Sequence, residues 1–114
     1  MKERNFIEGR KNEALVCKFL KDKGYKILEN NYTTKLGEID IIAKDGDVIV
    51  FVEVKYRLTD KFGMPAEAVN YTKQQKIRRV ALLYLQANKL NEEEIRFDVV
   101  EVLNDQISHI ENAF

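Results

Sequence analysis

Two short apolar segments, residues 37–43 and 48–57, constrain the fold of this chain most strongly. Both are rich in β-branched residues, which favours strands, and the polar, glycine-containing turn between them predicts an antiparallel hairpin. Charges interrupt both predicted strands: Asp40 in the first, and Glu53 and Lys55 in the second. A charge within a buried strand needs a partner, so these three side chains are the first candidates for a functional site.

The register of this hairpin decides whether the three charges can meet. Side chains alternate between the faces of a strand, so Glu53 and Lys55 share a face. We expect Ala43 to lie opposite Val48, which puts Asp40 one diagonal step from Glu53 on that face, about 7–8 Å away. A hairpin one residue tighter would move every side chain of the first strand to the other face and remove Asp40 from the site.

Length and composition predict a single soluble domain over residues 1–114. The chain is 45% hydrophobic and 33% charged, which is typical of a globular protein with a modest core. No apolar run approaches the ~18 residues of a membrane span, and the first residues lack an apolar signal region. We therefore expect a cytoplasmic protein with no membrane partner.

The residue types limit the chemistry that the chain can perform. One cysteine, Cys17, excludes an intramolecular disulfide and a cysteine-rich zinc cluster, and the one histidine, His109, disfavours a histidine-based site. A metal would then be held by oxygen ligands, which suits Mg²⁺ or Mn²⁺. Asp98 also interrupts an apolar run, and we assign it to the polar face of a strand rather than to chemistry.

The net charge is zero, with 19 basic and 19 acidic residues, but its distribution is uneven. No Asp or Glu occurs between Ala68 and Asn91, where five basic residues fall: Lys73, Lys76, Arg78, Arg79 and Lys89. This segment has two interpretations, a solvated helix face or a phosphate-binding ridge.

Further elements follow from periodicity and turn signals. We predict a helix over residues 5–23 that ends at Gly24, and a second helix from Thr72 to about residue 87, opened by a capping box of Thr72 and Gln75. The stripe of the first helix contains Ala14, Cys17 and Leu20, and that of the second contains Ile77, Val80, Ala81 and Tyr84. Strands are expected at residues 25–32, 95–103 and 107–110, and a polar loop, suited to substrate contacts, at residues 57–65.

Phosphodiester hydrolysis requires a metal, an activated water and stabilisation of the leaving oxygen. Asp40 and Glu53 would bind the metal, with the backbone carbonyl of Val54 as a further ligand. Lys55 would orient the attacking water or stabilise developing charge. Glu13, on the inward stripe of the first helix, has two interpretations: it pairs at the edge of the stripe, or it reaches the metal site.

The same residues resemble a known family. The blocks that carry the likeness are Gly9 with Glu13-Ala14, Gly24-Tyr25, Gly37-Glu38-Ile39-Asp40, Phe51-Val52-Glu53-Val54-Lys55 with Arg57, Gly63, Lys73, and Phe97-Asp98-Val99. They resemble the PD-(D/E)XK nuclease superfamily and, more closely, its YraN-like (UPF0102-type) family of predicted endonucleases, which are similar to archaeal Holliday-junction resolvases.

This resemblance implies a restriction-endonuclease-like α/β fold, with a mixed central sheet of about five strands and helices on both faces. It implies a homodimer that cleaves DNA, including branched DNA, with Mg²⁺ or Mn²⁺. Asp40, Glu53 and Lys55 would be catalytic, with Glu13 assisting. Arg57, Lys73 and Lys76 are our candidates for substrate binding. The alternatives are a non-catalytic nucleic-acid-binding scaffold and a protein-binding module.

Overall fold

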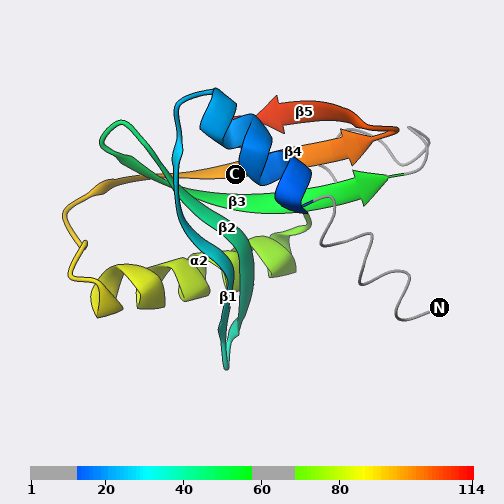
Figure 1. Cartoon of the computed structure of the whole chain (residues 1–114). Helices are drawn as coiled ribbons and strands as arrows, with labels where there is room; N and C mark the ends of the chain where they lie inside the picture. The colour runs from blue at the N-terminus through cyan, green and yellow to red at the C-terminus, as the bar shows by residue number, and fades with distance from the viewer. Residues whose placement is uncertain (1–12, 58–68) are drawn as a thin grey trace.

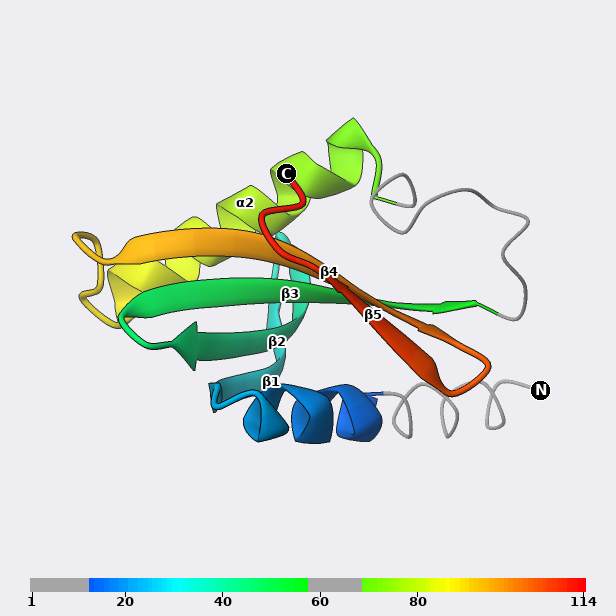
Figure 2. The same ribbon diagram turned by 90° about the horizontal axis from the view of Figure 1, so that it is seen from above.

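The computed structural model describes residues 13–57 and 69–114. Within them, five strands form one sheet in the order β1-β2-β3-β4-β5, with a helix on each face (Figures 1 and 2). The elements are helix 13–22, β1 (Lys26–Thr34), β2 (Gly37–Asp45), β3 (Val48–Arg57), α2 (Tyr71–Ala87), β4 (Glu94–Leu103) and β5 (Gln106–Ile110). β3 and β4 run parallel, whereas the other neighbours are antiparallel. The expected mixed sheet with helices on both faces is confirmed, and it is compatible with a restriction-endonuclease-like fold.

Alternation along β3 supplies the two faces of the core. Ile49 and Phe51 pack under α2, and Val50 and Val52 pack under helix 13–22. The predicted stripe of α2 is buried on the first of these faces, with the addition of Leu85. Within the part of the chain that the structure describes, neither helix is long and apolar enough to span a membrane.

The inward face of helix 13–22 agrees with the prediction at Leu20 and at the partly buried Cys17, but not at Ala14. Val16 and Leu20 are fully buried against the sheet, whereas Ala14 is exposed. The helix ends as predicted at Gly24, whose φ of +94° suits glycine. The Gly24 N–H bonds to the Lys21 carbonyl and the Tyr25 N–H to the Leu20 carbonyl, which is a Schellman termination. The predicted residues 5–12 of this helix lie outside the described residues.

The hairpin register differs by two residues from the prediction. Asp45, not Ala43, lies opposite Val48, because the polar residues before Gly46 extend the strand and leave a two-residue turn. A shift of two residues preserves the face of every side chain, since the side-chain period of a strand is two. Asp40 therefore remains on the side of Glu53.

The start of α2 also corrects the sequence prediction. The N-cap is Asn70, whose side chain accepts a hydrogen bond of 2.9 Å from the Lys73 N–H. Thr72 and Gln75 lie inside the helix, so the expected capping box does not form. Asparagine is as good an N-cap as threonine, and it comes two residues earlier. The predicted substrate loop falls largely at residues 58–68, which lie outside the described residues.

Candidate active site

Asp40 lies where β2 separates from β3. The pairing of the two strands ends at Ile41 opposite Val52, while β2 continues alongside β1, and the two bend together past α2 (Figure 1). The Val54 N–H, beyond the end of this pairing, donates a hydrogen bond of 2.8 Å to Asp40 Oδ2. The carboxylate thus takes the place of a strand partner, and the divergence opens space beside it.

This space is a pocket of about 220 Å³ on the α2 side of the sheet. Asp40 and Glu53 line it together, as the sequence predicted from their shared face. The full lining is Gly37, Glu38, Asp40, Glu53, Lys73, Lys76 and Ile77. Acidic groups from two strands thus face basic groups from one helix.

Two lysines reach the same oxygen of Glu53. Lys73 Nζ lies 2.5 Å from Glu53 Oε1, and Lys55 Nζ lies 3.7 Å from it. The Glu53 side chain is only 7% exposed, whereas those of Lys55 and Lys73 are 25% and 41% exposed. A charge-assisted contact to a buried carboxylate is among the stronger hydrogen bonds in a protein, so Lys73 is a firm partner of Glu53 in this structure.

Burial and crowding change the acid–base properties of the site. Burial, and then the charge of Glu53, raise the pKa of Asp40 to about 7, although the Val54 hydrogen bond opposes the shift. Burial and the neighbouring Lys73 lower the pKa of Lys55. Burial also disfavours the charge on Lys73, but its hydrogen bonds to Glu53 and Lys55 outweigh this and raise the pKa of Lys73. Asp40 is therefore under-compensated beside the paired Glu53, and a divalent cation would relieve it.

The donor set fits a hard divalent cation. Asp40 and Glu53 offer carboxylate oxygens in one pocket, the ligand type that Mg²⁺ and Mn²⁺ prefer, with waters for the other positions. Among residues 13–57 and 69–114, no three Asp, Glu, His or Cys side chains are grouped as a metal cage. Mg²⁺ does not need one, since it commonly binds through one or two carboxylates. The Val54 N–H donates a hydrogen bond to Asp40. The Val54 carbonyl as a metal ligand stays a prediction.

Glu13 is not brought into this pocket. It lies on helix 13–22, across the sheet from α2, and lines a separate hollow with Cys17, Lys18 and Asn30 among others. The charge of Glu13 also raises the pKa of Asp40, but less than the charge of Glu53 does. Among residues 13–57 and 69–114, Glu13 does not line the pocket of Asp40 and Glu53, and its assistance to the metal stays a prediction.

The three predicted substrate-binding residues fall in different surroundings. Lys73 and Lys76 line the pocket from successive turns of α2, and Lys76 is exposed. Arg57 is buried instead, with its Nε 3.0 Å from Glu101 Oε2 on β4. Both side chains of this ion pair are less than a tenth exposed, so the charge of Arg57 is paired with Glu101 in this structure, and its role in substrate binding stays a prediction.

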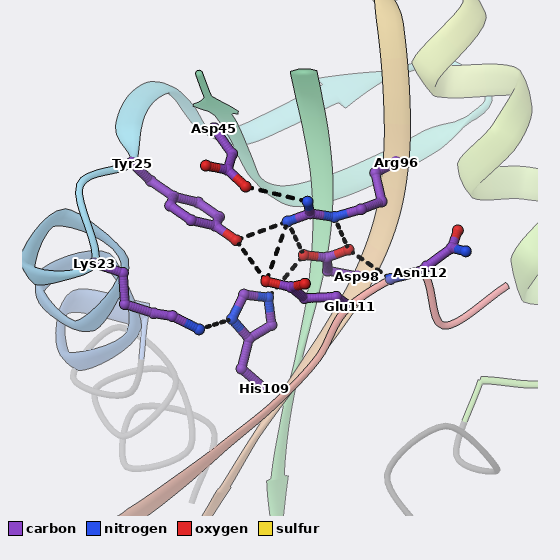
Figure 3. Close-up of polar contacts among 8 residues, drawn as sticks. All are labelled: Lys23, Tyr25, Asp45, Arg96, Asp98, His109, Glu111 and Asn112. Carbon is purple, nitrogen blue, oxygen red and sulfur yellow. Dashed lines mark hydrogen bonds and ion pairs between the residues drawn. The ribbon is translucent and has the colours of Figure 1, made fainter. Parts of the chain in front are cut away.

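Asp98 departs furthest from its sequence interpretation. It is fully buried, on the face covered by helix 13–22 and not on a polar surface (Figure 3). Arg96 donates two hydrogen bonds of 2.9 Å to it, His109 Nε2 lies 2.7 Å away and the Asn112 N–H 3.0 Å away. Burial opposes its charge, but these bonds prevail and hold the pKa of Asp98 below its usual value.

This cluster extends outward from Asp98 to the surface. Arg96 also bonds to Asp45 and to the Tyr25 hydroxyl, and Lys23 Nζ lies 2.9 Å from His109 Nδ1 (Figure 3). It links the end of the first helix, β2, β4 and β5, and it lies on the other face of the sheet from Glu53. We assign it a structural role. The sequence signal for it was the interrupted strand, which does not tell a buried acid from an exposed one.

The fold and the pocket define a class: an α/β domain compatible with the restriction-endonuclease-like fold, with an acidic pair and lysines where two strands diverge. The chain belongs to the UPF0102 family, since residues 12–102 match the family described as "Uncharacterised protein family UPF0102". It is 56% identical over 106 residues to a UPF0102 protein of Thermodesulfovibrio yellowstonii, covering 93% of this chain and 94% of the relative. It is 52% identical over 112 residues to one of Clostridioides difficile, covering 96% and 98%. The expected family is confirmed.

Proposed function

We propose that this protein is an endonuclease that hydrolyses DNA phosphodiester bonds with Mg²⁺ or Mn²⁺, including those of branched DNA. The observation that supports it best is the pocket that Asp40 and Glu53 share, in which Asp40 is under-compensated and Glu53 contacts Lys55 and Lys73. A structural ion pair would need one acid and one base, and it would not leave Asp40 with a pKa near 7.

In this proposal each side chain has one task. Asp40 and Glu53 hold the divalent ion, which supplies charge neutralisation at the phosphate when bound. Lys55 Nζ, beside Glu53, orients the attacking water and stabilises the charge that develops on the phosphate oxygens. Burial lowers the pKa of Lys55, so it exchanges a proton more readily near neutral pH than an exposed lysine does.

The start of α2 is the proposed DNA contact. Its first turn has no acidic residue, and its N-terminus carries positive partial charge from the helix dipole. Lys73 and Lys76 add two ammonium groups at the pocket. A DNA strand there would place a phosphate between these lysines and the acidic pair. On this proposal the protein acts in the cytoplasm, as a homodimer in line with the resemblance of its sequence.

The test is cleavage of linear, nicked and four-way-junction DNA in Mn²⁺. The wild type should cleave, and Asp40→Asn and Lys55→Ala should lose activity by about 100-fold or more, as expected for groups that act in the transition state. Glu92→Gln is the control: Glu92 is exposed and does not line the pocket, so its loss should leave cleavage largely intact.

The outcomes separate the alternatives stated above. Cleavage that persists in both Asp40→Asn and Lys55→Ala would identify a contaminating nuclease. DNA binding without cleavage under any condition would favour the non-catalytic scaffold. Binding to none of the three DNA forms would favour a protein-binding module and end the proposal.

A further inference from the structure

Lys73 occupies an unusual position for a lysine. It is in the first turn of α2, three residues after the N-cap Asn70, where the helix dipole disfavours a positive charge. The Asn70 side chain fixes its backbone N–H, so the start of its side chain is held in place. Such a placement is stabilised only if the ammonium group finds a nearby anion, and that anion is Glu53.

The contact with Glu53 lies where a metal ion would bind. Lys73 Nζ is 2.5 Å from Glu53 Oε1, and a divalent ion would need that carboxylate at about 2.0–2.2 Å. An ammonium group and a divalent ion so close together repel each other strongly. Lys73 and a divalent ion therefore compete for the same oxygen of Glu53.

We propose that Lys73 is a resident counter-ion, which neutralises Glu53 while metal is absent and moves to a substrate phosphate when the ion enters. This inference rests on the proposed function, because it requires metal to bind at Asp40 and Glu53. It adds a competition: metal binding must first displace Lys73.

The structure allows this movement. The Lys73 side chain is 41% exposed, so its ammonium can leave Glu53 without opening the core. Lys55 Nζ, 3.7 Å from the same oxygen, is a second ammonium group beside Glu53. Lys76 lines the same pocket from the next turn of α2, which gives the displaced lysine a neighbour on the phosphate side.

Calorimetric titration of the full chain with Mn²⁺, without DNA, tests the competition. Lys73→Met should bind Mn²⁺ about three- to tenfold more tightly than the wild type, a modest factor because Lys73 is partly exposed. Lys73→Arg, which keeps the charge, should stay near the wild type. Lys76→Met removes one charge from the same pocket without touching Glu53, so it should change affinity less than Lys73→Met.

The possible results are distinguishable. Wild-type binding that Lys73→Met leaves unchanged or weakens overturns this inference alone, and equal tightening by Lys76→Met reduces it to a general charge effect, which also overturns it. Absence of Mn²⁺ binding in every variant overturns the metal site and the proposed function with it. Thermal unfolding checks that each variant is folded. If Lys73→Met does not fold, Lys73→Gln replaces it, and it should also bind Mn²⁺ more tightly than the wild type.

Discussion

Replacing Asp40 with asparagine should stabilise the metal-free protein at neutral pH. Asp40 is held against Glu53 in a pocket that removes both from water, and its pKa rises from 3.8 to about 7. Asparagine keeps the shape and can still accept the Val54 hydrogen bond through its side-chain oxygen. It removes only the charge, which the fold disfavours.

The size and sign of the effect follow from the pKa. The folded protein binds the Asp40 proton more tightly than the unfolded chain does, so wild-type stability falls as pH rises from about 4 to about 7. Each pKa unit corresponds to about 1.4 kcal/mol, so the penalty at pH 8 is at most about 4 kcal/mol, and we expect about 2–4. Below pH 4 the carboxyl is protonated in both states and the advantage of Asp40→Asn disappears.

Urea unfolding in EDTA, at several pH values from 4 to 8, measures this difference. The stability advantage of Asp40→Asn over the wild type should grow steadily from pH 4 to pH 8, whereas Glu92→Gln, which alters an exposed carboxylate outside the pocket, should match the wild type. An Asp40→Asn protein no more stable than the wild type at pH 8 would refute the view that Asp40 is under-compensated.

Three further predictions follow from the contacts. Asp98→Asn should lower the free energy of unfolding at pH 7 by about 3–5 kcal/mol in urea titrations, because it leaves Arg96 without its buried anion; a loss below about 1 kcal/mol would contradict the structural role. Arg57→Met should lower it by a similar amount, about 3–5 kcal/mol, by orphaning the buried Glu101, and unchanged stability would instead favour the original DNA-binding role. Lys76→Ala should weaken DNA binding across sequences and reduce the salt slope by about 0.7–0.9, and an unchanged slope in fluorescence anisotropy would exclude a phosphate contact.

Periodicity predicted most of the fold, because it reports directly which side chains are buried. The alternation in β3 places Phe51 and Val52 on opposite faces of the sheet, and the spacing in α2 identifies its buried stripe, as the structure confirms. The turn at Asn104 and Asp105 was also predictable, since both adopt positive φ, at 49° and 66°, and these residue types tolerate it well.

Register and end positions were less predictable, because polar residues close a strand as readily as they form a turn. Asp45 pairs with Val48 although its character suggested the turn. Asn70 caps α2, whereas the capping-box pattern predicted a start at Thr72. The face of Asp40 survived the register error only because the error was an even number of residues.

The two acidic residues of the site could be predicted from the sequence, but the ion-pair partners of the charged residues could not. Asp40 and Glu53 were found from strands interrupted by charge, and the structure brings them to one pocket. The burial of Arg57 depends on Glu101 of β4, a strand 37 to 46 residues further along the chain. Spacing along the sequence does not show which distant residues become partners. The hydrogen bonds around Asp98 could not be predicted for the same reason, because partners such as His109 lie on another strand.

The most direct test of the central claim is a crystal of the full chain soaked in Mn²⁺ and measured for anomalous scattering. The account predicts one strong peak at about 2.0–2.3 Å from a carboxylate oxygen of both Asp40 and Glu53, with Lys73 withdrawn from Glu53. A crystal that takes up Mn²⁺ elsewhere while Lys73 remains on Glu53 would contradict it.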